Sequence, residues 1–224
     1  MTEFSAHALF NFPPQAKVGR VLPKSKIYQH GRVSTALRER FVRQVDQITW
    51  QYKLAPETIN LPAKAGVVEI EIFDITLKTE NLDEAVLRAI DRAIPLPIIF
   101  QTHHAERTRM VAAYKRPSEA QVGKWVTADY FVGAWQSASA KRQPLPIALD
   151  LHSLYEQLLR SLLAHSARPN ESLPSHIDRL TQLRSQQNEY RKLESRLHKE
   201  KQFNRKVVLN AELRSLGQQI QQLQ

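Results

Sequence analysis

Alternation of apolar and acidic residues marks one segment of the chain as a β-strand. In residues 67–78, VVEIEIFDITLK, apolar side chains occupy every second position and alternate with Glu69 and Glu71. A period of two is typical of a strand with one buried face. The pattern then slips by one position, so that Ile75 and Leu77 continue it. Because a β-bulge produces such a slip, we expect a bulge within this strand.

Helical spacing predicts one helix on each side of this strand. Residues 35–48 carry apolar side chains at intervals of three and four, which favours a helix with one buried face. Residues 82–94 repeat that spacing, and Pro95 stops it. Asn81 and Glu84 have the separation of a helix-start cap and its reciprocal partner, so we expect the second helix to begin at Asn81.

Three further apolar runs complete the expected sheet: PIIFQTH, RMVAAYKR and WVTADYFVGAW at residues 97–103, 109–116 and 125–135. The strand, helix, strand order of residues 67–102 predicts a parallel pair with a right-handed crossover, and the later strands are expected to pair antiparallel. Prolines in the first thirty residues indicate an irregular start. The pattern predicts an α+β fold, a mixed β-sheet domain with packed helices.

The last part of the chain has helical periodicity throughout. LDLHSLYEQLLRSLLAH, residues 149–165, predicts an amphipathic helix, and residues 166–174 have the composition of a linker. Ser175 and Asp178 have the spacing of a helix-start cap. From Ser175 to the end of the chain, apolar residues, most of them leucines, recur at intervals of three and four residues. We therefore expect a mixed α/β domain at residues 1–166, a linker at 167–174, and a coiled-coil-like helical rod or hairpin at 175–224. The apolar side of such a helix must be buried against a partner helix, in a hairpin or in a homodimer.

Charge adds an expectation about partners. The 224 residues carry a formal net charge of +10, which favours polyanions or acidic proteins. Basic residues concentrate at 17–43 and 191–206, and we expect salt-sensitive, sequence-nonspecific nucleic-acid binding there, through Lys24, Lys26, Arg38, Lys199, Lys201 and Lys206. The sequence has no cysteine, no long apolar run and no leader-like start, which predicts a cytoplasmic protein with no membrane association.

No familiar catalytic motif is present. Glycine-rich phosphate loops and a Gly-x-Ser-x-Gly turn are absent from the sequence, so no cofactor is expected. His103 and His104 would point to opposite faces of a strand, and no metal site is expected. Glu69, Glu71, Asp74 and Lys78 resemble the metal-binding strand of a restriction-type nuclease. No lysine lies two residues after any of these carboxylates, so a solvated polar strand face is the favoured interpretation.

One segment of the rod is unusual. KEKQFNRKVVLN, residues 199–210, combines four cations with one aromatic residue, consecutive aliphatic residues and two asparagines. Apolar residues flanked by cations suit the recognition of a specific partner helix, and asparagines at a helix seam fix its register. The predicted partner-binding residues are Phe203, Asn204, Arg205, Val207 and Asn210. A helix folded back on its own domain is the structural alternative.

Several segments of the sequence resemble those of a known protein family. The chain resembles the bacterial domain of unknown function 4391 family in five segments, which occur in the family's order over nearly the whole chain. These segments are WQYKLAPETINL, VVEIEIFDITLK, AIDRAIPLPIIF, LHSLYEQLL and EKQFNRKVVLN. One departure is Leu96, where a polar residue, usually histidine, is expected. The resemblance implies no reaction. It implies a genetic context beside restriction-type DNA methyltransferases and helicases, in loci that resemble phage defence.

Two functions are therefore expected as alternatives. The first is a non-enzymatic accessory subunit that docks a methyltransferase or helicase of the same locus, with nucleic acid as a second expected partner. The second is a divergent metal-dependent nuclease that uses the carboxylates of the 69–78 strand. A purely structural homodimer through the C-terminal helices is a third interpretation.

Overall fold

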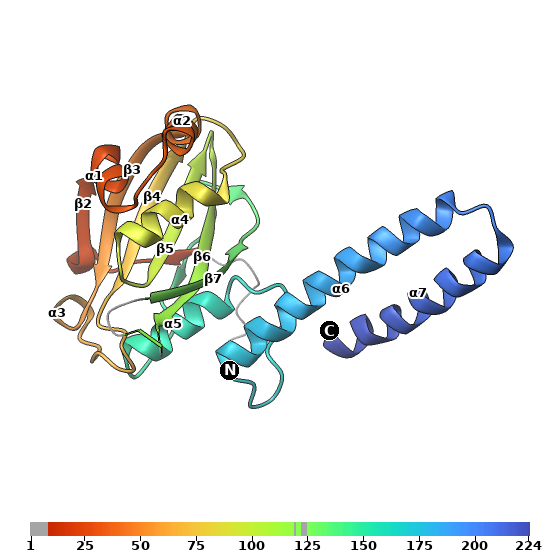
Figure 1. Ribbon diagram of the computed structural model, residues 1–224. Helices are drawn as coiled ribbons and strands as arrows, with labels where there is room; N and C mark the ends of the chain where they lie inside the picture. Colours follow the sequence, from red (N-terminus) through yellow and green to blue (C-terminus); the bar gives the residue numbers. More distant parts are fainter. Residues whose placement is uncertain (1–8, 119, 122–124) are drawn as a thin grey trace. The chain divides into compact units, whose positions relative to one another are not determined.

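The computed structural model describes residues 9–118, 120–121 and 125–224. The chain forms two compact units, residues 1–164 and residues 165–224 (Figure 1). The first unit contains a mixed β-sheet with packed helices, and the second consists of two long helices. The expected α+β class is therefore confirmed, including the long C-terminal helices.

A mixed sheet forms the centre of the first unit. Its strand order is β2-β3-β4-β5-β6-β7, and β4 and β5 are parallel whereas the other neighbours on this path are antiparallel. The expected parallel pair and the antiparallel later strands are thus confirmed. The bounds are β2 Lys17–Val21, β3 Val45–Leu54, β4 Ile70–Leu77, β5 Ile98–His104, β6 Arg107–Pro117 and β7 Trp125–Val132. The short β8, Gln136–Ser137, pairs with β6, and β1, Phe10–Asn11, pairs with β9, Gln143–Pro144.

Helices cover both faces of this sheet. The helices α1 (Lys24–His30), α2 (Thr35–Gln44) and α4 (Glu84–Ala93) pack on one face, where they enclose a buried apolar cluster with the strands (Figure 1). On the opposite face, Tyr114 of β6 stacks on Tyr155 of α5 (Leu151–Arg160). The Tyr155 hydroxyl donates to Ala113 O at 2.9 Å, which ties α5 to β6. Short helical turns lie at Pro14–Ala16 (η1) and Pro56–Ile59 (α3).

Strand β3 differs from the prediction, because the expected helix over residues 35–48 ends at Gln44 and the chain continues as a strand. The register of β3 against β4 shifts between Val45 and Gln47 and again between Trp50 and Tyr52. The first shift leaves Val45 and Ile48, three residues apart, both buried. A strand with a bulge can therefore imitate helical spacing. The bulge that was expected in residues 67–78 lies instead in β3, the strand paired with β4.

Two further expectations about the first unit were wrong. The residues before Gly31 form β2 and α1 instead of an irregular segment, apart from residues 1–8, which lie outside the described residues. Helix α4 begins after Asp83, whose carboxylate accepts from Ala85 N at 2.9 Å. Asn81 therefore lies before the cap. Asp is as good a start residue as Asn, so composition alone did not separate the two positions.

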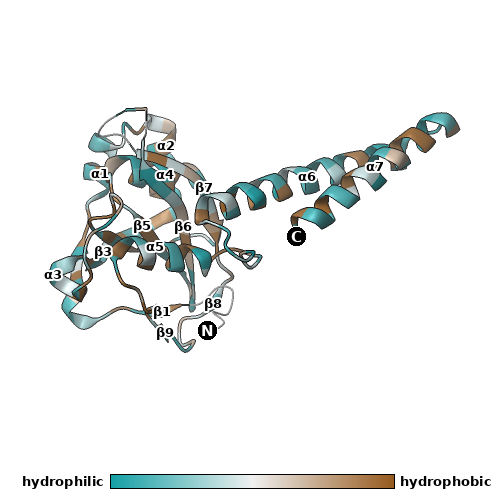
Figure 2. Ribbon diagram, turned by 90° about the horizontal axis from the view of Figure 1, so that it is seen from below, coloured by the Kyte–Doolittle hydropathy of each residue, from teal (hydrophilic) through white to brown (hydrophobic). Residues whose placement is uncertain are grey.

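The second unit is a helical hairpin. Helix α6 (Leu173–Lys199) and helix α7 (Phe203–Leu223) pack against each other, and residues 200–202 form the turn. Buried leucines at helical spacing on α7 face the seam, at Leu209, Leu213 and Leu216. Figure 2 shows hydrophobic and hydrophilic stretches along both helices. Ser172 caps α6 through its hydroxyl, so the expected cap at Ser175 was three residues late.

No helix within the described part of the chain is both long and apolar enough to cross a membrane.

Candidate functional site

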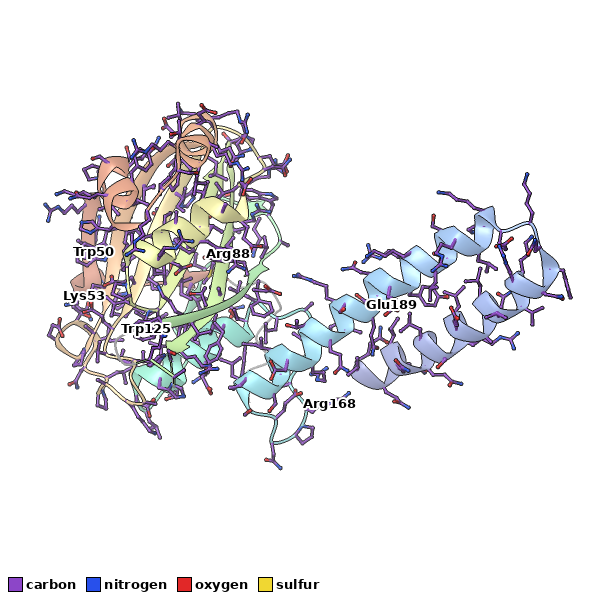
Figure 3. The ribbon with its side chains drawn as sticks, in the orientation of Figure 1. Trp50, Lys53, Arg88, Trp125, Arg168 and Glu189 are labelled. Atoms are coloured by element: carbon purple, nitrogen blue, oxygen red, sulfur yellow. The ribbon has the colours of Figure 1, made fainter. Side chains whose placement is uncertain are left out.

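The strand β4 carboxylates form the first candidate site. Glu71 is only 3% exposed and accepts a hydrogen bond from Trp50 Nε1 at 2.5 Å. Lys53, which follows Trp50 on β3 after Gln51 and Tyr52 (both Trp50 and Lys53 are labelled in Figure 3), pairs with Glu69 at 3.0 Å and with Glu57 at 2.8 Å. Burial raises the pKa of Glu71 to about 8, and the negative charge of Glu69 adds to the increase. Glu71 is therefore largely protonated at neutral pH.

The other two residues of the nuclease hypothesis lie apart from this pair. Asp74 Oδ1 accepts from Gln101 Nε2 at 2.8 Å and lies 3.5 Å from His103 Nε2. Lys78 Nζ donates to Val42 O at 2.9 Å. Among the residues that the structure describes, no group of three or more histidine, aspartate or glutamate side chains is arranged to hold a metal ion. Of the four residues, the structure brings only Glu69 and Glu71 together.

A second polar cluster in the first unit was not anticipated from the sequence. Lys115 of β6 is buried, and its ammonium donates to Asp91 O at 2.8 Å, Asp91 Oδ1 at 3.1 Å and Ile94 O at 2.5 Å. The hydroxyl of Tyr130 donates to the other carboxylate oxygen of Asp91. Burial raises the pKa of Asp91 and lowers the pKa of Lys115. An ammonium has three donors, so Lys115 is fully satisfied and fixes the end of α4.

A cavity of about 410 Å³ lies over this cluster. Arg88 and Trp125, both labelled in Figure 3, belong to its lining. The cations of this cavity are engaged: Arg88 pairs with Glu84 at 2.6 Å, and Arg92 donates to Gly31 O at 3.0 Å. The cluster is therefore better explained as a polar brace between α4, β6 and β7 than as an anion site.

The hairpin turn carries the most exposed apolar residues of the second unit. Phe203 is 78% exposed, and Val207 and Val208 are also exposed. Residues 191–210 contain seven lysines and arginines against two glutamates, so these apolar side chains lie in a strongly basic segment. We call Phe203, Val207 and Val208, with the cations of residues 199–206, the hairpin tip. Exposed apolar residues in a charged rim are typical of an interaction surface.

Glu200 organises the turn at the hairpin tip. Its Oε1 accepts from Lys201 N at 2.8 Å and Gln202 N at 2.9 Å, and these backbone bonds lower the pKa of Glu200. The other predicted tip residues are exposed. Asn204 is exposed, and Asn210 Nδ2 donates within α7 to Lys206 O at 2.9 Å. The seam between α6 and α7 therefore contains leucines and neither asparagine.

The predicted nucleic-acid residues lie in both units. Lys199, Lys201 and Lys206 are exposed at the hairpin tip. In the first unit, Lys26 of α1 and Arg38 of α2 are exposed, and the Arg38 guanidinium lies 5.4 Å from the centre of the Tyr28 ring. Lys24 differs, because its Nζ donates to Val45 O at 2.6 Å and burial lowers its pKa. Its ammonium is thus less available to a phosphate than that of Lys26.

Comparison with known proteins identifies the family. The family model described as "Domain of unknown function (DUF4391)" matches residues 10–220, and the chain therefore belongs to this family. No curated protein and no solved structure matches the chain.

Proposed function

We propose that this member of the DUF4391 family is a non-enzymatic accessory subunit whose hairpin tip docks a partner protein. The observation that carries the proposal is the exposure of Phe203, Val207 and Val208 within a basic segment. An exposed aromatic residue beside aliphatic residues has the composition of an interface centre, and the cations around it form a polar rim. The partner should present an apolar groove with an acidic rim.

The charge of the hairpin tip argues against the simplest alternative partner, a second copy of this chain. A tip-to-tip dimer would bring two segments of seven cations and two glutamates together. Like charges in contact oppose association. Aliphatic Val207 and Val208 likewise add little to a phosphate-binding surface, which favours a protein over nucleic acid at this position. A methyltransferase or helicase encoded in the same locus is the proposed partner.

Co-expression tests this proposal. Tagged full-length chain should retain its locus partner, and Phe203→Ala should weaken retention by about 2 kcal/mol or more, as for other central aromatic anchors. Val208→Ala should also weaken retention. Val42→Ala is the matched control, since Val42 on α2 is 60% exposed and Val208 is 57% exposed. Equal retention by all four proteins would refute docking through the hairpin tip, and a partner-independent dimer mass in light scattering would favour the homodimer.

A nuclease remains the second proposal because of one observation, the contact between Glu69 and the buried Glu71 beside Lys53. A carboxylate pair next to a cation could hold a divalent metal ion once both groups are ionised. The full chain should be incubated with Mg²⁺ or Mn²⁺ and several forms of DNA. Cleavage that Glu71→Ala abolishes would support the nuclease, and no cleavage under any of these conditions would favour the accessory subunit.

A further inference from the structure

A second cavity in the first unit has room for a small planar ligand. Its volume is about 220 Å³, and residues of α1, β3, β4 and the end of α4 line it. A cavity of about 150 Å³ accommodates benzene in another protein, so this one can hold a larger ring. The lining is mostly apolar, with walls formed by Leu22, Ile27, Trp50, Phe73, Ala93 and Ile94.

The polar group in the wall of this cavity is the buried carboxyl of Glu71. Trp50 Nε1 uses one of its acceptor positions. A protonated carboxyl group has one O–H donor and further acceptor positions, and the contact with Glu69 uses only part of this capacity, so Glu71 retains hydrogen-bonding capacity for a ligand. Burying a carboxyl beside apolar walls costs free energy, and the raised pKa of Glu71 reflects that cost. A ligand that hydrogen-bonds to Glu71 would offset it.

Two basic side chains lie at the mouth of the same cavity. Lys26 and His30 of α1 are both exposed and both belong to its lining. Arg20 of β2 is the direct partner of Trp50 in the antiparallel β2–β3 pair. Directly paired residues project from the same face of a sheet, which places Arg20 on the side of the cavity. A ligand with an apolar ring would match the apolar walls of the cavity, and an anionic group on the same ligand would match the basic side chains at its mouth.

We propose that this cavity binds a nucleotide. The base lies between Trp50 and the aliphatic walls, Glu71 hydrogen-bonds to the polar edge of the base, Lys26 pairs with the phosphate, and His30 hydrogen-bonds to it. Stacking of a base on an aromatic ring is tolerant of sequence, and a cationic rim follows the backbone. A carboxyl group complements the exocyclic amino groups of adenine and cytosine. The site lies in the first unit and does not depend on docking through the hairpin tip.

Calorimetric titration of the full chain tests the proposal. The ligands are AMP, CMP, GMP and UMP in one arm, and short single-stranded oligonucleotides of each base in the other. AMP or CMP should bind more tightly than UMP. Tighter binding of the oligonucleotides would identify a strand as the source of the base, and equal or weaker binding would identify a free nucleotide. Absence of binding in both arms would overturn the proposal.

Variants distinguish the cavity from the rest of the basic surface. Ala93→Trp fills the cavity and should abolish mononucleotide binding. The control is Ala85→Trp on the same helix, outside the cavity lining, which should bind as the parent does. Glu71→Leu should weaken binding about tenfold, as expected for one hydrogen bond to an ionisable group. Asp74→Asn on the same strand should not change binding. Parental affinity in both Ala93→Trp and Glu71→Leu would refute the site.

Discussion

Arg179 and Glu171 form a two-point ion pair at the base of the hairpin. Arg179 Nε lies 2.8 Å from Glu171 Oε1, and Arg179 Nη2 donates to Glu171 Oε2 at 3.0 Å. Arg179 is only 6% exposed, and its Nη1 donates to Leu223 O at 2.8 Å. One side chain thus joins the segment before α6 to the end of α7. Arg168 adds a parallel bond to Gln222 O.

Removing Arg179 should therefore destabilise the hairpin. Arg179→Ala leaves Glu171 and the Leu223 carbonyl without these donors. Hydrogen bonds to charged groups contribute about 1.5–3 kcal/mol each, so we expect a loss of about 2 kcal/mol or more in the free energy of unfolding. Thermal and denaturant unfolding followed by circular dichroism measures it. Arg184→Ala on the exposed side of α6 is the control and should stay near the parent. Equal loss in both variants would contradict a specific role.

The same pair predicts a dependence on pH. Hydrogen bonds from Arg179, the main cause, hold the pKa of Glu171 at about 2, below its ordinary value. A carboxyl group whose pKa is lowered by folding stabilises the folded state above its unfolded pKa of about 4.3, and this contribution is lost as the pH falls toward 2. Hairpin stability should therefore decrease between about pH 5 and pH 2. Melting curves over this range should show a smaller decrease in Glu171→Gln. An identical decrease would assign the effect to other groups.

Lys115 should be critical for the first unit. Lys115→Met removes the ammonium and leaves Asp91 buried with Tyr130 as its remaining side-chain donor. Breaking one side of a buried ion pair typically costs about 3–5 kcal/mol. The double variant Asp91→Asn with Lys115→Met should recover part of this loss, because no unpaired charge remains. A double-mutant cycle of unfolding free energies measures the coupling. Additive losses would mean that the two side chains do not interact.

The sequence predicted β4, β5, β6 and α4 well because each depends on local patterning. β3 was missed for a physical reason, since its bulges moved the buried residues out of alternation. A hairpin was one of the two forms expected for residues 175–224, but the position of its turn was not predicted, because residues 200–202 contain no glycine or proline. Glu200 instead ends the helix by accepting two backbone N–H groups. The spacing of the leucines does not predict these hydrogen bonds from the backbone to the Glu200 side chain.

The candidate sites also combine features that local sequence determines with features that depend on tertiary packing. Lys115 shares its side of β6 with Val111 and Ala113, so alternation alone could have placed it inward. Its partner Asp91 is on α4, and the pairing depends on how α4 packs on the sheet. Glu71 was recognised as a candidate, whereas its burial was not, because α1 and the end of α4 cover the side of β4 that carries Glu71, and no strand pattern reports this. The charge of the hairpin tip was accessible from the sequence, whereas the exposure of Phe203 was not, because it depends on which residues of α7 pack against α6.

The first unit should fold without the hairpin. Its buried cluster extends from Ile27 to Tyr130, so none of these core residues belongs to the second unit. Residues 1–166 should therefore show a cooperative melt and dispersed amide resonances. The same truncation should lose the locus partner that the full chain retains, because it lacks the hairpin tip. A truncated chain that is unfolded or insoluble would contradict this division.

Nucleic-acid binding should depend on salt and on identified cations. Binding of single- and double-stranded DNA to the full chain should weaken steeply from low to high salt, with a linear dependence of log K on log salt. Lys199→Ala, Lys201→Ala and Lys206→Ala should each reduce the slope by about one unit if that ammonium contacts a phosphate. Binding that is equally tight at low and high salt would contradict a phosphate-directed interaction.

The lysines of α1 provide a sharper comparison for the same measurement. The Lys26 ammonium is exposed, whereas the Lys24 ammonium is held by the Val45 carbonyl at 2.6 Å. A phosphate can pair with Lys26 without breaking a bond inside the protein, but Lys24 would first have to leave its acceptor. Lys26→Ala should therefore reduce the salt slope by about one unit, and Lys24→Ala should leave the slope near that of the parent while lowering the melting temperature. Equal effects of the two substitutions on the slope would mean that net charge alone, and not the position of each ammonium, determines binding.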